Sequence, residues 1–255
     1  MSENQTSVKP SLVEQFVSHF FWLSFGGGVN STALAILLAT GKLPQYEPWR
    51  IVFADTGEEQ DHTYEFIEKH FSPWLETQGK ILEIVRYKET PLERWERFSM
   101  TGSRQFRACT EYNKITPIKQ HIATNGGGLK LIGIDSGETH RAIERADSAY
   151  PLVELGIDRE ECGMIIKDTG LPSPGKSGCW HCPFMRVHEI LNLARHYPCR
   201  FNRIDRLEQM ATAKTGQQRY QWGNKPCAYW RERATAQKSL LEDYDIAMPC
   251  ECYDG

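Results

Sequence analysis

A run of three glycines is the first feature of this sequence that could do chemistry. The run lies in Phe25-Gly26-Gly27-Gly28-Val29-Asn30-Ser31, between an apolar stretch and a stretch that favours helix. Glycines let the backbone approach a ligand closely, and the first turn of a helix offers unpaired N–H donors and a positive dipole end. Asn30 and Ser31 could cap that helix or bond phosphate oxygens. The alternative is a tight turn alone, but the flanking elements favour a loop that binds the phosphates of ATP or a related adenylyl nucleotide.

Eight cysteines are the second chemical feature. The sequence shows no secretion signal, so we expect a reducing cytoplasm and thiols that bind metal or react rather than a disulfide framework. Cys179-Trp180-His181-Cys182-Pro183 is a C-x-x-C in a loop rich in glycine and proline. Two cysteines at this spacing supply half of a tetrahedral metal shell, and a following proline often accompanies iron–sulfur ligands. A redox pair and two buried thiols are the alternatives. His181 is expected to be an ordinary loop residue, with a hydrogen-bond donor that supports the metal ligands as the alternative.

The composition is that of a globular protein. The chain has 255 residues, 40% hydrophobic and 25% charged, with a net charge of -3. This excludes a largely disordered chain, and the charge does not indicate a constitutive nucleic-acid coat, although a local basic groove is compatible with it. No apolar run reaches the roughly 18 residues that a membrane helix needs, so no membrane partner is expected.

Strand-like and helix-like patterns alternate in the first part of the chain. Apolar, strand-like runs occur at 19–25, 49–55, 80–87 and 129–135, and helical patterns at 31–40, 61–77 and 112–124. Strands joined by helical crossovers predict an α/β fold with a doubly wound, mostly parallel sheet. After Tyr150 prolines and glycines interrupt the chain, and helices are expected near 188–196 and 202–213. We therefore expect a nucleotide-binding domain at 1–150 and a helical, cysteine-bearing extension at 151–255.

Several motifs together resemble one family. The glycine loop is similar to the pyrophosphate-binding (PP) loop of the adenine nucleotide alpha-hydrolase superfamily, with Gly26 and Asn30 where most members have Ser and Asp. More narrowly, the chain resembles the phosphoadenylylsulfate reductase-like branch, which also contains sulfurtransferases and DNA phosphorothioation proteins. The resemblance begins near Ser24 with the glycine loop, and four further stretches carry it. These are Phe53–Glu58 with Thr63, Arg107–Thr110 with Lys114 and Pro117, Gly133–Asp135 with Glu138 and Arg141, and Lys176–Pro183.

The resemblance implies a HUP-like sheet with one nucleotide beyond the carboxyl ends of its strands. Arg141 is expected to contact phosphate, with a surface arginine as the alternative. Asp55 and Glu138 are expected to orient ribose or magnesium, with a turn-capping role as the alternative for Asp55. The full nucleotide-binding set is expected to be Ser24, Phe25, Gly26, Gly27, Gly28, Val29, Asn30, Ser31, Asp55, Thr56, Gly57, Gly133, Glu138 and Arg141.

The resemblance also implies a [4Fe–4S] cluster, and zinc is the chemical alternative for four thiolates. Cys109 and Cys162 are expected to complete the set with Cys179 and Cys182. Reductases of the family use a nucleophilic cysteine after a glutamate near the C-terminus, and Cys252 follows Glu251 here.

Three functions are compatible with these features. The first is an enzyme that adenylates a substrate with ATP and Mg²⁺ and then transfers sulfur, with a nucleic acid as the expected substrate. The second is a reductase of adenylylsulfate or its 3′-phosphorylated form, with Cys252 as the nucleophile. The third is a nucleotide sensor without turnover, which Asn30 favours. Asn30, Ser31, Arg141 and Cys252 are the candidate catalytic residues. The expected partners are an adenine nucleotide, a sulfur donor or a thioredoxin-like reductant, and a second copy of the chain.

Overall fold

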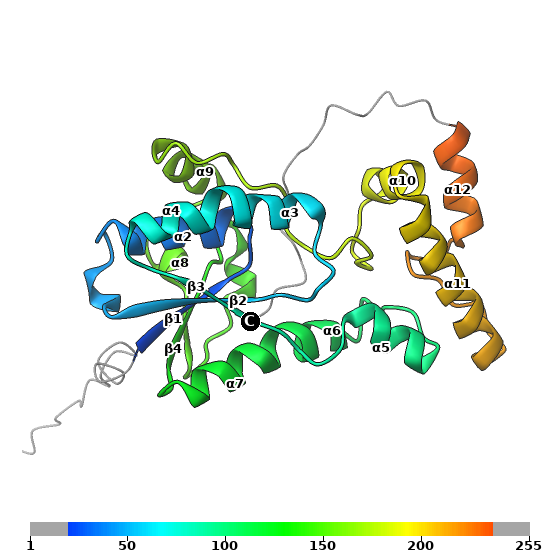
Figure 1. Ribbon diagram of the computed structural model, residues 1–255, viewed down its shortest axis with the longest axis horizontal. Helices are drawn as coiled ribbons and strands as arrows, with labels where there is room; N and C mark the ends of the chain where they lie inside the picture. The colour runs from blue at the N-terminus through cyan, green and yellow to red at the C-terminus, as the bar shows by residue number, and fades with distance from the viewer. Residues whose placement is uncertain (1–19, 237–255) are drawn as a thin grey trace, which may run out of the picture. The chain divides into compact units, whose positions relative to one another are not determined.

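The computed structural model, which describes residues 20–236, contains a five-stranded parallel sheet. The strand order is β3-β2-β1-β4-β5. Figure 1 labels β1 to β4. The strands are β1 (Phe20–Phe25), β2 (Trp49–Ala54), β3 (Leu82–Val85), β4 (Gly128–Ile132) and β5 (Ser148–Ala149). β1 lies between β2 and β4, and both neighbours run parallel to it. The expected α/β fold with a mostly parallel sheet is confirmed.

Helices connect and flank the strands. The α-helices are α2 (Val29–Ala39), α3 (Asp61–Phe66), α4 (Ser72–Thr77), α5 (Pro91–Phe98), α6 (Ala108–Thr110), α7 (Thr116–Thr124), α8 (Pro151–Glu154), α9 (Arg159–Asp168), α10 (Val187–His196), α11 (Pro198–Thr215) and α12 (Cys227–Ala236). Two 3₁₀ turns, η1 (Pro44–Tyr46) and η4 (Ser136–Arg141), and two π-helical turns, η2 (Ile67–Phe71) and η3 (Glu111–Ile115), complete the described elements. Among these helices, none is long and apolar enough to cross a membrane.

β1 is buried on both faces, as expected for an inner strand of a parallel sheet. Trp22 and Leu23 are both fully buried, although their side chains leave opposite faces of the strand. The indole of Trp22 packs edge-on against His121 of α7, with ring centres 5.3 Å apart, and its N–H donates to the Gly127 carbonyl at 3.0 Å. α2 follows β1 and contacts both β1 and α9. Figure 1 shows α2 and α9 on one side of the sheet and α7 on the other.

The chain divides into two compact units, and neither is a continuous segment. Unit 1 contains the described residues up to Phe53 together with 68–83 and 118–173. Unit 2 contains 54–67, 84–117 and the described residues from Pro174 onward. The helices α8 and α9, which follow Tyr150, therefore belong to unit 1. The domain boundary expected at residue 150 stays a prediction.

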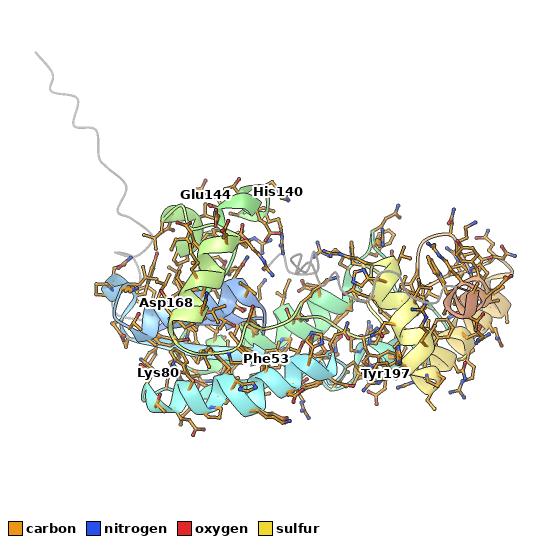
Figure 2. All side chains as sticks on the ribbon, turned by 90° about the horizontal axis from the view of Figure 1, so that it is seen from above. Phe53, Lys80, His140, Glu144, Asp168 and Tyr197 are labelled. Carbon is orange, nitrogen blue, oxygen red and sulfur yellow. The ribbon has the colours of Figure 1, made fainter. Side chains whose placement is uncertain are left out.

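Each unit has its own apolar packing. In unit 1 the rings of Phe25 and Phe71 stack with their centres 4.3 Å apart. Lys80, labelled in Figure 2, follows α4 and places its ammonium 4.5 Å from the centre of the Trp49 ring. In unit 2 the helices α10, α11 and α12 pack together around a buried cluster that includes Trp95, Trp180, Phe201, Trp222 and Trp230.

Most of the expected elements are present, with shifted ends. The strand expected at 80–87 is reduced to Leu82–Val85, and the one expected at 129–135 covers Gly128–Ile132. The helix expected at 202–213 begins earlier, at Pro198, because proline fits the first turn of a helix. The helices α5 and α9 were not expected from the sequence, and neither were α8 and α12. α5 and α9 share a readable start. Both begin with a capping box, at Thr90 with Glu93 and at Asp158 with Glu161.

Candidate nucleotide loop and thiol site

The glycine loop leads from the end of β1 into α2. Gly27 has φ 72°, a left-handed conformation that favours glycine, and Gly28 is the extended N-cap residue. Ser31 closes the loop: its hydroxyl accepts from the Gly26 N–H and donates to the Gly28 carbonyl, both at 3.2 Å. The helix therefore begins at Val29, two residues before the expected start. Asn30 and Ser31 lie within its first turn and do not cap it.

The loop offers a ligand its backbone rather than its apolar side chains. Ser24, Phe25 and Val29 are buried, with 3%, 1% and 4% of their surface exposed. Their expected part in nucleotide binding stays a prediction, and with the side chains buried it would fall to main-chain N–H and C=O groups. The α2 N-terminus adds the partial positive charge that favours an anion.

Gly133 lies against the first turn of α2. A Cβ at this position would be 2.8 Å from both the N and the Cα of Ser31, closer than real Cβ atoms approach backbone. Only glycine fits without moving the loop or the strand end. The structure thus brings together two segments that the sequence assigned to one site, the glycine loop and Gly133–Arg141.

Asn30 connects this site to two further residues. Its Nδ2 donates to Asp135 Oδ2 at 2.8 Å, and its Oδ1 accepts from Arg159 Nη1 at 3.0 Å. Asn30 and Asp135 are buried, with 6% and 2% of their surface exposed. The second oxygen of Asp135 accepts from the Gly137 N–H at 2.9 Å and so caps the turn η4. Arg159 is the first residue of α9 and was not expected to take part.

Glu138 and Arg141 form an ion pair within η4. Arg141 Nη1 donates to both carboxylate oxygens of Glu138 at 2.9 Å. Both side chains are largely buried, with 11% of Arg141 and 14% of Glu138 exposed. Arg141 is therefore held in a local ion pair with little of its side chain exposed. Its contact with phosphate and the part of Glu138 in orienting a ligand stay predictions.

Asp55 caps the turn after β2 within unit 2. Its Oδ1 accepts from the Gly57 N–H and from the Tyr64 hydroxyl, both at 2.7 Å. Its Oδ2 accepts from Arg86 Nε at 2.8 Å. The turn-capping alternative for Asp55 is confirmed. The nucleotide-binding parts expected of Asp55, Thr56 and Gly57 stay predictions.

Three of the four expected ligand cysteines lie in unit 2. Cys109 and Cys182 pack against the same buried apolar cluster, and Cys109 is close enough to Cys179 for an ionised Cys109 to raise the pKa of Cys179. The C-x-x-C loop is a turn in which the Cys182 N–H donates to the Cys179 carbonyl at 3.1 Å. An antiparallel bridge pairs Cys179 with Glu59. All three are free thiols.

A buried ion pair lies beside these thiols. Lys114 Nζ is 3.1 Å from Glu59 Oε1, and the Glu59 side chain has no exposed surface. The Thr56 hydroxyl donates to the same Glu59 oxygen at 3.1 Å and lies 3.4 Å from Cys179 Sγ. Burial raises the pKa of Cys179 well above its ordinary value, with Glu59 adding to the shift and Lys114 opposing it. Burial likewise raises the pKa of Cys109, again opposed by Lys114. Without a metal both groups are therefore neutral thiols near pH 7.

Cys162 lies in unit 1, whereas the other three expected ligands lie in unit 2. It is fully buried in α9, which packs on α2. Burial raises its pKa to about 12, with Asp135 adding to the shift and Arg159 opposing it. Its surroundings are therefore those of the glycine loop, and its expected part in a four-thiolate set stays a prediction.

The expectation that His181 is an ordinary loop residue is wrong. Only 1% of His181 is exposed, and its ring lies edge-on to Trp95 and Trp180, with centres 4.9 Å away in each case. Its Nε2 donates to Glu58 Oε2. Glu58 also accepts from the Thr90 hydroxyl at 2.7 Å and the Leu92 N–H at 3.1 Å. This network fixes the residue between the two cysteines of the C-x-x-C.

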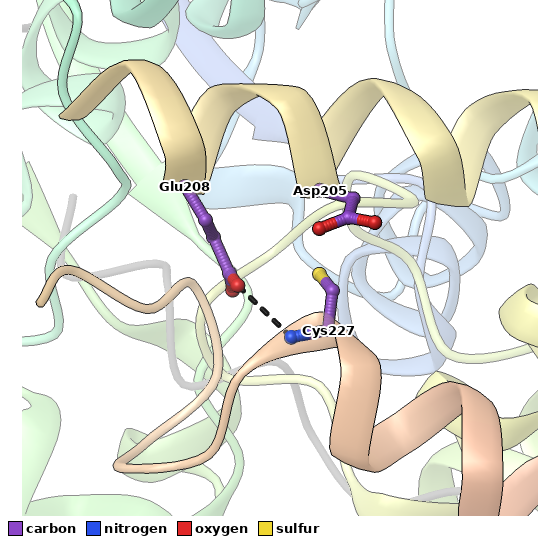
Figure 3. A group of neighbouring side chains, drawn as sticks. All are labelled: Asp205, Glu208 and Cys227. Atoms are coloured by element: carbon purple, nitrogen blue, oxygen red, sulfur yellow. Dashed lines mark hydrogen bonds between the residues drawn. The ribbon is translucent and has the colours of Figure 1, made fainter. Parts of the chain in front are cut away.

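A third group contains Asp205 and Glu208 of α11 and Cys227 of α12 (Figure 3). Their ligand-capable atoms lie within 4.8 Å of one another. Glu208, however, accepts from the backbone N–H groups of Gln221 at 2.8 Å and Cys227 at 2.9 Å, and Asp205 pairs with Arg231 at 2.6 Å. These bonds give the carboxylates the role of holding α12 against α11. Cys252, the expected nucleophile, lies outside the described residues.

Comparison with known sequences identifies the family. Residues 21–149, just over half of the chain, match the phosphoadenosine phosphosulfate reductase domain. The chain belongs to this family. The match covers the glycine loop, Cys109 and the Gly133–Arg141 segment, and it ends before Cys162 and the C-x-x-C.

A curated relative and a solved structure are also similar. An uncharacterized protein of Methanocaldococcus jannaschii is 26% identical over 204 residues, which are 69% of this chain and 38% of the relative. The chain thus spans well under half of that relative's length. The U34-tRNA thiolase NcsA from Methanococcus maripaludis, solved with its [4Fe-4S] cluster, has a TM-score of 0.49 and 12% identity over 87% of this chain and 85% of that one. A likeness of this degree transfers neither ligand nor activity to the present chain.

Proposed function

We propose that this protein is an ATP-dependent sulfurtransferase that acts on a nucleic-acid substrate. A substrate oxygen attacks the α-phosphorus of ATP and pyrophosphate leaves. A sulfur nucleophile at the oxidation level of sulfide then forms the new bond to carbon, and AMP leaves with the substrate oxygen. The sequence has no net redox change, so it requires no external reductant.

The family and the glycine loop support the nucleotide half of this proposal. Ser31 fixes the conformation of the loop through its bonds to Gly26 and Gly28, and Gly133 packs closely against the first turn of α2. N–H donors fixed before the reaction stabilise charge as it develops, because they need not reorganise. The loop would therefore bind the departing pyrophosphate, and Mg²⁺ would offset its remaining charge.

The observation that carries the sulfur half is the group of Cys109, Cys179 and Cys182 within one unit. The residues present fit an iron–sulfur cluster: three free thiols, a proline directly after Cys182, and a lysine whose charge opposes that of the thiolates. These three cysteines would hold a [4Fe–4S] cluster, with zinc as the chemical alternative. Such a cluster, held by three protein thiolates, would be able to bind the incoming sulfur as a further ligand. Cluster binding would deprotonate the buried thiols, and Lys114 favours that change.

Pyrophosphate release tests this function. The anaerobically purified protein would be incubated with ATP, Mg²⁺, sulfide and total RNA from cells that lack the protein. We expect pyrophosphate and AMP in equal amounts, and only when RNA is present. Ser31→Ala should slow the formation of both pyrophosphate and AMP. Ser173→Ala, on the surface of unit 1, should slow neither. ATP binding without either product would contradict the proposal.

A second candidate is reduction of adenylylsulfate or phosphoadenylylsulfate, which the description of the matching family favours. In that reaction a thiolate attacks sulfur, a nucleotide leaves, and a thioredoxin-like protein releases sulfite. Cys252 would be the nucleophile. Sulfite formation from either sulfonucleotide that is lost in Cys252→Ser would establish this function in place of the first.

A further inference from the structure

The amide of Asn30 is hydrogen-bonded in both directions inside the glycine-loop site. Its N–H₂ group donates to buried Asp135 and its oxygen accepts from Arg159. An amide side chain can bond to both Asp135 and Arg159, because it offers a donor on one side and an acceptor on the other. The partners also fix which way the amide points, since a carboxylate cannot donate and a guanidinium cannot accept.

An aspartate at position 30 would change the charge of the site. Its carboxylate would lie against that of Asp135, at the place where Nδ2 now lies 2.8 Å from Oδ2. Two carboxylates at this separation repel each other unless a proton or a metal ion lies between them. With asparagine, the first turn of α2 keeps the partial positive charge of the helix end and has one carboxylate beside it instead of two.

Arg159 brings a full positive charge to the same turn. Its guanidinium has five N–H donors, and Asn30 is its hydrogen-bond partner among residues 20–236. Burial lowers the pKa of Arg159, while Asp135 and Glu138 oppose that shift, and the group stays charged at neutral pH. A half-buried guanidinium with donors to spare beside a phosphate-type loop has the chemistry of a bidentate phosphate ligand.

We propose that Arg159 is a phosphate-binding residue of the nucleotide site and that Asn30, oriented by Asp135, is the positioning residue that holds it there. This inference rests on the proposed nucleotide binding. It assigns the site a preference for nucleotides with two or more phosphates over AMP and adenosine. Arg159 supplies part of the charge compensation that Mg²⁺ would otherwise provide, so this preference persists when Mg²⁺ is chelated.

Calorimetric titration of the full chain with ATP, ADP, AMP and adenosine, in EDTA and in Mg²⁺, tests this assignment. We expect Arg159→Gln to weaken ATP and ADP at least 10-fold in EDTA and to leave adenosine unchanged. Arg159→Lys should recover part of the affinity, because lysine keeps the charge and loses the fork. The control is Lys167→Gln, which removes an exposed cation near the other end of α9. This variant should bind all four ligands as the wild type does.

The role of Asn30 has its own test. Asn30→Asp should weaken ATP at least 10-fold in EDTA, and Mg²⁺ should recover more of this loss than it does for Arg159→Gln. Adding Asp135→Asn exchanges amide and carboxylate, so it restores both hydrogen bonds and should recover most of the affinity.

The outcomes separate the two claims. If the wild type binds ATP and Arg159→Gln binds it equally well, the phosphate role of Arg159 is overturned while the proposed function stands. A loss of thermal stability in Arg159→Gln with unchanged ATP affinity also overturns the phosphate role of Arg159, because it shows a structural role only. If the folded wild type binds no nucleotide, the proposed function fails and this inference fails with it.

Discussion

The imidazole of His181 donates its Nε2 proton to the carboxylate of Glu58, and both side chains are buried. Burial raises the pKa of Glu58, but the hydrogen bond and charge of His181, with the bonds from Thr90 and Leu92, outweigh it and hold the pKa below the ordinary value. Glu58 is therefore ionised at neutral pH and can only accept. His181 lies between Cys179 and Cys182, two of the expected cluster ligands. Its bond to Glu58 therefore fixes the conformation of the C-x-x-C loop.

Removing the carboxylate should destabilise the protein. Glu58→Leu leaves the His181, Thr90 and Leu92 donors without a partner, and we expect a loss of about 3–5 kcal/mol in the free energy of unfolding. Glu58→Gln keeps an acceptor for one of them and should cost about 1–2 kcal/mol. Urea denaturation measures both. Glu111→Gln changes an exposed carboxylate of the same unit and should cost less than about 0.5 kcal/mol. Equal effects of all three variants would contradict the network.

The contribution of Glu58 should depend on pH in a defined direction. The pKa of Glu58 in the folded protein lies below the ordinary value of 4.5, so the carboxylate stabilises the fold above pH 4.5 and loses this effect as the pH falls through the lowered folded value. The stability difference between wild type and Glu58→Gln should therefore shrink as the pH falls below about 4.5. A difference that grows on acidification would show that Glu58 is protonated in the native protein.

Gly133→Ala should disturb the glycine loop. The new methyl group would be 2.8 Å from backbone atoms of Ser31, which cannot move without shifting α2. We expect a loss of about 1–3 kcal/mol in stability and weaker ATP binding. Gly163→Ala is the matched control, because no atom lies within 4 Å of the added methyl group and the residue is inside α9. That variant should gain up to about 1 kcal/mol. Equal stability of the two variants would refute the close contact.

Glu208 should act as a structural residue. Glu208→Ala removes the acceptor of the Gln221 and Cys227 N–H groups, and we expect a loss of about 1–3 kcal/mol measured by urea denaturation. Arg206→Ala, an exposed position on the same helix, should be nearly neutral. Stabilisation of the wild type by added Zn²⁺ that disappears in Glu208→Ala would contradict this reading and make the group a metal site.

Much of the fold could be predicted because its signals are local. The apolar runs at β1 and β2 and the helix after the glycines follow directly from residue pattern. The helices α5 and α9 also had a readable signal, since Thr90 with Glu93 and Asp158 with Glu161 are capping boxes. These boxes were obscured by the prolines and glycines around them.

The contacts that define the sites could not be predicted in the same way. Asn30 is 105 residues from Asp135 and 129 from Arg159, and no local pattern links them. His181 is 123 residues from Glu58. Cys162 was grouped with the other cysteines through the family resemblance, and the structure describes it in unit 1, where α9 packs on α2. Long-range pairing depends on topology, which spacing alone does not reveal.

Iron and sulfide analysis of the anaerobically reconstituted protein tests the central claim most directly. We expect about four iron and four sulfide per chain, with broad visible absorption. Cys109→Ser, Cys179→Ser and Cys182→Ser should each lose most of this iron, and Cys199→Ser, at an exposed position, should keep it. A colourless wild-type protein that binds one zinc ion and no iron would contradict the cluster and with it the proposed sulfur transfer.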